Sequence, residues 1–331
     1  MEGATGIDVS MLKGKKLLNM DSEEEGVMLA SCAGGCRADV KLPVERETVS
    51  GTKLTVSLSG LTGGHSGSEI DKGRGNANTL MSRLLRDASA PVAIASIEGG
   101  RKDNAIPREC TAQIIVAPDE AAAVKASIEQ AAAEIAEEFK ASDPDLKLAV
   151  SEETDCSESA ISAKDSARVI ALIEALPNGI IRMSREIDKL VETSLNLGVL
   201  KSDAAAVTLR YAVRSSVGVA KKSLKNQLVC IAGAFAAEVT FEGDYPAWEY
   251  KKDSKLREDM VRIFEEMYGK KPTVEAIHAG VECGLLSGKI EGLDCISMGP
   301  DMYDIHTTEE RLSISSAKRS YEYILRVIAC K

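Results

Sequence analysis

The stretch Lys53-Leu-Thr-Val-Ser-Leu-Ser-Gly-Leu-Thr-Gly-Gly-His-Ser-Gly67 decides how the middle of this chain folds. Leu54, Val56 and Leu58 alternate with polar residues, which is the period of a half-buried β-strand. The glycines that follow end the strand and place His65 in an irregular loop. The pattern therefore predicts a strand that delivers a histidine-bearing loop.

The residues after this loop repeat one order of elements. Helical and alternating apolar patterns predict a helix at 76–87, strands at 91–97 and 111–117, a helix at 119–139 and a strand at 147–150. With the opening strand, this order is a split βαβ unit of the ferredoxin-like kind. A second round follows, with a helix at 165–176, strands at 190–200 and 205–213, a helix at 221–236 and a strand at 237–242. We expect the strands of the two halves to lie side by side in an α+β lid domain over residues 41–244.

The two ends of the chain predict a different unit. An apolar stripe over residues 256–267 indicates a helix that stops at Gly269. A closing helix is expected to bury Ala317, Tyr321, Ile324, Leu325 and Ile328. Strands are expected at 16–20 and 293–298, and the segment 244–248 reads as a linker. The fold class is thus α/β: an α/β sandwich domain from residues 1–40 and 245–331, interrupted by the lid.

Composition narrows the function classes. The chain has 331 residues, 44% hydrophobic and 28% charged, with a net charge of −10 and no run rich in Lys or Arg, so nucleic acid is not an expected partner. No apolar stretch reaches the roughly 20 residues of a membrane span, and the N-terminus does not read as a signal peptide. We expect a cytoplasmic protein without a membrane partner. The eight cysteines are too dispersed for a disulfide framework, and we expect reduced, mostly buried thiols.

Histidine is the scarcest reactive residue, with three in the chain. His65 and His306 lie in glycine- and acid-rich loops, where a metal ligand or a proton-transfer group is a common arrangement. His306 is expected at the carboxyl end of the strand at 293–298, and Asp21 likewise follows the strand at 16–20. Loops at the carboxyl ends of strands carry the ligand sites of open α/β sheets.

Several motifs together resemble one family. They are Asn19-Met-Asp-Ser-Glu-Glu-Glu-Gly26, Gly63-Gly-His-Ser-Gly67, Lys72-Gly-Arg-Gly-Asn-Ala-Asn78, Asn104-Ala-Ile-Pro107, Arg214-Ser-Ser216, His278-Ala-Gly-Val-Glu-Cys-Gly284 and the His306 loop. In this order they resemble the aminoacyl-histidine dipeptidases, also called Xaa-His or cytosolic non-specific dipeptidases, of the M20 metallopeptidases. The resemblance implies a two-zinc peptidase domain with an inserted lid, and hydrolysis of dipeptides such as β-alanyl-histidine. Manganese or cobalt are alternative metals, and a homodimer is an option.

The chain departs from the family pattern at its start. The resemblance implies an upstream HxD zinc ligand, a bridging Asp and a Glu-Glu pair that contains the general base, and this sequence contains no HxD motif. We therefore expect an incomplete peptidase domain, corresponding to the C-terminal part of such an enzyme. Two alternatives stay open: a catalytically inactive remnant that binds peptides or a partner, and one half of a split enzyme that pairs with the missing N-terminal half.

The resemblance assigns three residues to the chemistry. Asp21 and His306 would be terminal ligands of different zinc ions, so this chain alone should bind metal weakly. His65 would polarise the scissile carbonyl and stabilise the oxyanion. The simpler alternatives are a solvated acidic turn for Asp21 and a backbone-capping loop histidine for His65.

Four further residues are expected to bind the substrate. Arg214 would hold its terminal carboxylate, because a guanidinium fits that planar anion in a bidentate manner; the alternative is a surface ion pair. His278 and Glu282 would line the cleft, although their spacing also fits an ordinary pair on one helix. Asn104 is a weaker candidate, since asparagine in such loops usually serves turns and caps.

Overall fold

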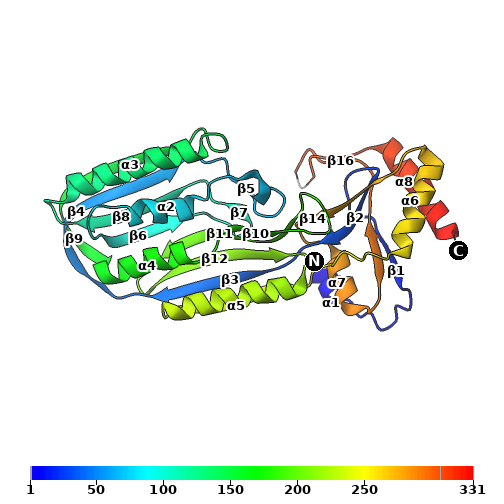
Figure 1. The fold of residues 1–331 in the computed structure, drawn as a ribbon, viewed down its shortest axis with the longest axis horizontal. Helices are drawn as coiled ribbons and strands as arrows, with labels where there is room; N and C mark the ends of the chain where they lie inside the picture. Colours follow the sequence, from blue (N-terminus) through cyan, green and yellow to red (C-terminus); the bar gives the residue numbers. More distant parts are fainter. Residues whose placement is uncertain (1, 306, 331) are drawn as a thin grey trace.

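The computed structural model describes residues 2–305 and 307–330, in which most strands belong to a nine-stranded sheet, the large sheet, or a four-stranded sheet, the small sheet. Figure 1 shows the large sheet with its helices at the left of the view and the small sheet at the right. Cores of apolar side chains fill both regions. The structure is thus a mixed α/β architecture with two packed units.

The large sheet joins the two halves that the sequence predicts. Its order is β13-β3-β12-β11-β6-β8-β4-β9, and β10 pairs with β11. The strands are β3 (Gly34–Pro43), β4 (Arg46–Ser59), β6 (Ala93–Gly99), β8 (Cys110–Val116), β9 (Lys147–Ile161), β10 (Gly179–Met183), β11 (Val191–Ser202), β12 (Ala206–Ser215) and β13 (Glu238–Tyr245). The halves meet where β6 pairs with β11, with Leu200 opposite Gly99. Their side-by-side placement is confirmed.

β3 supplies the first strand of the second half. It pairs antiparallel with β12 along its whole length, from Pro43 opposite Ala206 to Gly34 opposite Ser215. On its other side it pairs with β13, so this half has the same strand order as the first. Residues 34–40, expected in the first segment of the peptidase domain, therefore belong to the large sheet, because the residues that alternate along β3 point into its core.

Four helices cover one face of the large sheet (Figure 1). They are α2 (Ala77–Arg86), α3 (Ala121–Phe139), α4 (Ala163–Ala175) and α5 (Gly218–Ala234). Asn76 caps α2, because its side chain accepts the N–H groups of Asn78 and Thr79. The amide of Asn78 donates to the Leu197 carbonyl at 3.1 Å. These asparagines therefore serve caps and packing, as expected for such loops.

The small sheet interleaves the two ends of the chain. Its order is β1-β15-β2-β14, formed by β1 (Lys16–Asn19), β15 (Asp294–Ser297), β2 (Val27–Cys32) and β14 (Thr273–Ile277). β1 runs parallel to β15 and β2 parallel to β14. The carboxyl ends of β1 and β15 therefore lie together, as the expected α/β domain requires. Shorter elements are α1 (Glu2–Gly6), β5 (Gly64–His65), η1 (Ile70–Lys72), β7 (Ala105–Ile106), β16 (Met302–Tyr303) and β17 (Arg311–Leu312).

The helices beside the small sheet are α6 (Lys255–Tyr268), α7 (Glu282–Lys289) and α8 (Ile314–Ala329). As expected, α6 stops at Gly269, which takes a left-handed φ of 69°. Trp248, expected in a linker, is buried, and its backbone pairs with that of Cys32. The segment before α6 is therefore fixed against the small sheet.

The expected buried face of α8 is wrong at three of its five residues, whereas Ala317 and Ile324 are partly buried and Ile324 packs against the core. Tyr321, Leu325 and Ile328 are 62%, 49% and 68% exposed. The buried residues are instead Ser316, Ser320, Tyr323 and Val327. The helix turns this face to α6 because the two serines allow close packing and the hydroxyl of Tyr323 donates to the Met260 carbonyl at 2.6 Å.

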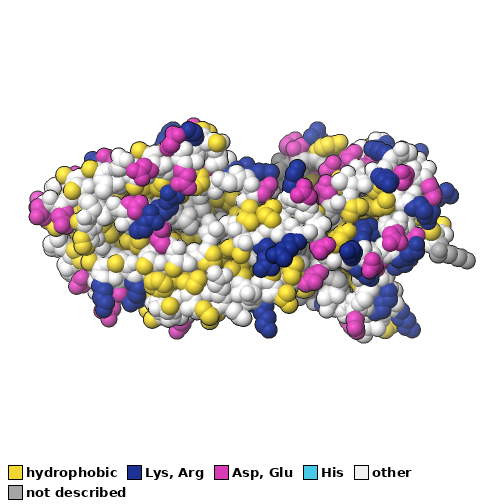
Figure 2. Space-filling model, in the orientation of Figure 1, with side chains coloured by type: hydrophobic (Ala, Val, Ile, Leu, Met, Phe, Trp, Pro, Cys, Tyr) yellow, Lys and Arg dark blue, Asp and Glu magenta, His cyan; other side chains and the backbone are white. Residues whose placement is uncertain are grey.

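The cysteines form no disulfide in the described part of the chain, and most of them are buried, as expected. None of the helices there has the length and apolar character needed to cross a membrane. On the face shown in Figure 2, acidic and basic side chains are interspersed over the surface.

Candidate functional site

The His65 loop and His278 meet where the two sheets approach each other. His65 lies on β5, and His278 follows the carboxyl end of β14. A Cβ atom added to Gly67 would lie 2.5 Å from the carbonyl oxygen of His278 and 2.9 Å from Cε1 of His65. Such distances leave no room for a side chain, so the loop of the large unit packs directly on the small unit through Gly67.

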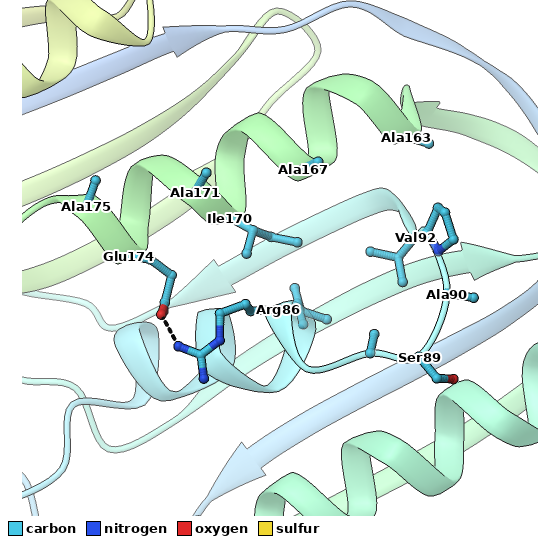
Figure 3. Close-up of a pocket in the computed structure, with 13 residues that line it drawn as sticks. Arg86, Ser89, Ala90, Val92, Ala163, Ala167, Ile170, Ala171, Glu174 and Ala175 are labelled. Carbon is cyan, nitrogen blue, oxygen red and sulfur yellow. Dashed lines mark hydrogen bonds and ion pairs between the residues drawn. The ribbon is translucent and has the colours of Figure 1, made fainter.

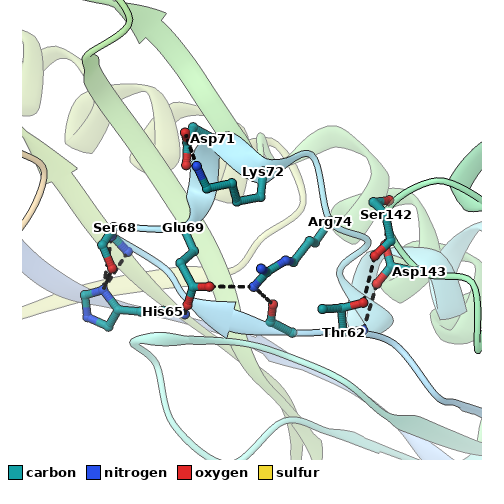
Figure 4. Close-up of polar contacts among 11 residues, drawn as sticks. Thr62, His65, Ser68, Glu69, Asp71, Lys72, Arg74, Ser142 and Asp143 are labelled. Atoms are coloured by element: carbon teal, nitrogen blue, oxygen red, sulfur yellow. Dashed lines mark hydrogen bonds and ion pairs between the residues drawn. The ribbon is translucent and has the colours of Figure 1, made fainter. Parts of the chain in front are cut away.

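Hydrogen bonds within its own loop hold His65 (Figure 4). The N–H groups of Gly67 and Ser68 donate to its Nδ1 at 3.3 and 3.1 Å. Its own N–H donates to Oε2 of Glu69 at 2.8 Å. The backbone-capping alternative is therefore correct for Nδ1. The other ring nitrogen points away from these partners in Figure 4, so the capping contact leaves it available.

Burial first, and then the positive charge of Arg214, lower the pKa of His65 below its usual value, while the Glu69 carboxylate acts in the opposite direction. The imidazole is consequently neutral at neutral pH. A neutral imidazole can donate one hydrogen bond and accept another.

Arg214 lies near the end of β12 and is 9% exposed. Its Nη1 approaches the hydroxyl of Tyr245 at 3.4 Å, and its Nε is buried without a hydrogen-bond partner. Among the described residues, no carboxylate lies within ion-pair distance of this guanidinium. The alternative of a surface ion pair is therefore wrong. A buried cation without a counter-ion is costly, which makes the position suited to an anionic ligand.

A cavity of about 250 Å³ opens beside Arg214. Asn104 and Tyr245 are among the residues that line it. The backbone carbonyl of Asn104 also accepts the N–H of Ser66 at 2.9 Å, which ties this wall to the His65 loop. Arg214 and Asn104 thus line the cavity, and the His65 loop lies behind Asn104 without lining the cavity itself.

A larger hollow, of about 820 Å³, lies elsewhere, between α2 and α4. Figure 3 shows its lining of small apolar side chains, with Arg86 and Glu174 paired at one end. None of the predicted site residues lines this hollow. The charged side chains of this hollow are Arg86 and Glu174, which already pair with each other. We therefore take the smaller cavity as the candidate functional site.

His278 is buried, with 5% of its surface exposed. Its Nε2 lies 2.7 Å from the hydroxyl of Ser194 on β11, and its Nδ1 is buried without a partner. Burial, followed by the charge of Arg214, lowers the pKa of His278 to about 3. His278 precedes α7, which begins at Glu282, so the alternative of an ordinary pair on one helix is wrong.

Glu282 opens α7 and is partly exposed. Its carboxylate makes no hydrogen bond or ion pair to another residue of the described ranges. An unpaired acid at a helix N-terminus is favoured by the helix dipole. Glu282 is thus close to His278 in the sequence, but among the described residues no hydrogen bond or ion pair links it to His65 or Arg214.

Asp21 is exposed just past the end of β1. Its neighbour Ser22 bonds Ser297, the last residue of β15, at 2.7 Å. The loop that leads toward His306 thus starts beside Asp21, but His306 itself lies outside the described residues. Within the described ranges, no group of three or more His, Cys, Asp or Glu side chains is arranged to hold a metal ion. Asp21 can offer one oxygen ligand.

Sequence reasoning missed the partners of these residues. Ser194 pairs with His278, Tyr245 contacts Arg214, and Glu69 and Arg74 brace the His65 loop. A serine or tyrosine in a strand gives no local signal of such a role. Glu69 and Arg74 follow His65 closely in the sequence, and this acid and base are the one pattern that could have indicated residues that hold the loop.

Comparisons with known proteins agree on one group of peptidases. The peptidase dimerisation domain of the M20 type matches residues 56–143. The cytosol non-specific dipeptidase of Escherichia coli (strain K12) is 33% identical over 96% of this chain, which spans 66% of that protein. The crystal structure of aminoacylhistidine dipeptidase from Vibrio alginolyticus has a TM-score of 0.91 and 32% identity, and the match covers 99% of this chain and 68% of that one.

Proposed function

Because this chain belongs to the aminoacylhistidine dipeptidase family of M20 peptidases, we propose that it serves metal-dependent hydrolysis of Xaa-His dipeptides such as β-alanyl-histidine. The observation that carries the proposal is the buried guanidinium of Arg214, which lacks a carboxylate partner among the described residues and lies beside the His65 loop. A dipeptide offers a carboxylate and a peptide carbonyl in close succession. In the proposal, Arg214 receives the carboxylate in the cavity, and His65 in the adjoining loop receives the carbonyl.

In this proposal Arg214 binds the C-terminal carboxylate of the substrate through paired N–H donors. Asn104, which also lines this cavity, contacts the substrate there. His65 donates a hydrogen bond to the oxygen of the scissile carbonyl and strengthens it as charge develops there, a contribution on the order of 3 kcal/mol. His278 and Glu282 border the cleft from the small unit.

The family implies dependence on a divalent metal. We propose zinc, two ions in the complete active site, with manganese or cobalt as alternatives, and Asp21 and His306 as ligands. Asp21 alone is too few ligands for a zinc site, and the described residues gather no larger group. The steps assigned to this chain are therefore substrate binding and carbonyl polarisation.

The alternative of an inactive remnant or a half of a split enzyme is not favoured, because the matched relatives are named as dipeptidases. The match to a dimerisation domain favours a homodimer. The E. coli relative is named as a cytosolic protein, which favours a cytoplasmic location for this chain.

Binding of alanyl-histidine to the full chain, measured by calorimetry, tests the proposal. Arg214→Ala should weaken binding by roughly 10- to 100-fold, since hydrogen bonds to charged groups contribute about 1.5–3 kcal/mol. Arg210→Ala is the matched control, because Arg210 lies on the same strand and is already paired with Asp39 at 2.7 Å. Equal losses in the two variants, or no loss in either, would remove the basis for the proposed function.

A further inference from the structure

We propose that Glu69 and Arg74 are positioning residues, which hold the His65 loop so that the imidazole presents its proton on Nε2 to the cleft. The inference rests on the proposed function, in which His65 polarises the substrate carbonyl. It adds which protonated form of His65 does so and which residues select that form.

The tautomer follows from the donors that surround Nδ1. The N–H groups of Gly67 and Ser68 both point at this nitrogen, at 3.3 and 3.1 Å, and the Ser68 hydroxyl lies 3.2 Å from it. A backbone N–H can only donate, so Nδ1 must present its lone pair. In a neutral imidazole the proton is then on Nε2, which makes Nε2 a hydrogen-bond donor.

Glu69 and Arg74 fix the backbone that carries the ring. Oε2 of Glu69 accepts the N–H of His65 at 2.8 Å, and Oε1 accepts Nη1 of Arg74, also at 2.8 Å. The same Nη1 donates to the carbonyl of Gly63 at 2.5 Å. This clamp spans the loop from Gly63 to Arg74 (Figure 4).

The clamp closes tightly on Gly64. A Cβ atom there would lie 2.3 Å from Nη1 of Arg74 and 2.9 Å from Oε2 of Glu69. Gly64 also has a φ of 137°, which side chains rarely allow. The ion pair and the loop conformation therefore depend on each other, and loss of the acid should release the ring.

The charges around His65 favour the neutral ring. Arg214 faces it from β12, His278 faces it from the small unit, and Glu69 lies on its own loop. Burial and Arg214 lower the pKa of His65, whereas the Glu69 carboxylate raises it. An imidazolium would also turn an N–H toward the two backbone donors at Nδ1. The loop thus disfavours the charged ring and the Nδ1–H tautomer alike.

Nitrogen NMR of the full chain, labelled with ¹⁵N-histidine, tests the proposal. The His65 signals are identified by their loss in His65→Gln. In the wild-type chain at neutral pH, Nδ1 should have the shift of an unprotonated nitrogen and Nε2 that of a protonated one. Glu69→Ala should add the second tautomer, because the loop no longer holds the backbone donors on Nδ1.

Two variants separate the role of the acceptor from that of the charge. Glu69→Gln keeps an oxygen for the His65 N–H, so the tautomer should remain while the pKa of His65 falls further. Asp71→Asn is the matched control, because Asp71 lies in the same loop and pairs with Lys72 at 3.0 Å on the surface. In this variant the tautomer and the pKa of His65 should equal those in the wild-type chain. Unchanged His278 signals show that each variant is folded.

The results separate this proposal from the proposed function. An Nδ1–H form or an even mixture in the wild-type chain overturns the tautomer assignment, and a Glu69→Ala spectrum equal to that of Asp71→Asn overturns the role of Glu69. Neither result depends on dipeptide binding. Where turnover is measured, Glu69→Ala should lower kcat by about 100-fold, because a misplacement of about 1 Å has an effect of this size. The affinity for the dipeptide should stay unchanged. Glu69→Gln should restore the rate.

Discussion

Nε2 of His278 lies 2.7 Å from the hydroxyl oxygen of Ser194. His278 follows β14 of the small sheet, and Ser194 lies on β11 of the large sheet. Both side chains are buried. The hydrogen bond therefore joins the two units directly beside Arg214 and the His65 loop. It fixes the relative position of residues that come from distant parts of the sequence.

Ser194→Ala should destabilise the chain by about 1–3 kcal/mol, because it leaves the buried Nε2 of His278 without a partner. Chemical denaturation measures the change. The control is Ser50→Ala, since Ser50 bonds Ser157 at an exposed position, and its effect should stay within about 0.5 kcal/mol. Equal effects for the two serines would show that the bond between the units adds no stability.

His278 should make the folded chain sensitive to acid. Its pKa is lowered to about 3 in the folded state, from an ordinary value of 6.5. The unfolded chain thus binds more protons between these values, and stability falls as pH decreases from about 6.5 toward 3, at up to about 1.4 kcal/mol per pH unit. His278→Gln should remove this part of the slope in denaturation measured at pH 4, 5, 6 and 7. An unchanged slope would contradict a buried neutral His278.

Gly67→Ala should disturb the contact between the units. The added methyl group would lie 2.5 Å from the carbonyl oxygen of His278, and backbone cannot yield as a flexible side chain does. We expect a loss of about 1–3 kcal/mol in stability and weaker dipeptide binding. Gly233→Ala is the control, because a Cβ there meets no atom within 4 Å and alanine favours the helix. A Gly67→Ala chain as stable as this control would argue against close packing at this point.

The exposed face of α8 should bind a hydrophobic dye. Ile314, Tyr321, Leu325 and Ile328 lie at helical spacing on one face and are between 49% and 86% exposed. Leu325→Lys should reduce ANS fluorescence while changing stability by less than about 0.5 kcal/mol, as for other surface positions. Tyr323→Ala, at a buried position, should cost about 3 kcal/mol or more. Dye binding that does not depend on Leu325 would place the dye elsewhere.

Regular elements were predictable from local periodicity. Residues 76–87 have a helical apolar pattern with asparagine before it, and the structure has α2 over Ala77–Arg86 with Asn76 as its cap. β3 was missed as part of the second half, because the entire first half separates it in the chain from its partner β12. The buried face of α8 was also missed, since Ser316 and Ser320 carry no hydrophobic signal.

The candidate site was predictable where composition is unusual. A glycine-rich loop around a rare histidine indicated His65, and an arginine at the end of an alternating strand indicated Arg214. Their partners depend on contacts between distant segments, such as Ser194 with His278, 84 residues apart. A serine there has no local pattern, so the hydrogen bond became visible only in three dimensions.

Comparison of alanyl-histidine with its C-terminal amide, by calorimetry on the full chain, tests most directly whether Arg214 binds the substrate carboxylate. The amide is neutral and leaves the buried guanidinium without an anion, so it should bind roughly 10- to 100-fold more weakly than the free acid. Arg214→Gln should bind both compounds with the same low affinity. Equal affinity of the wild-type chain for the acid and the amide would contradict the account.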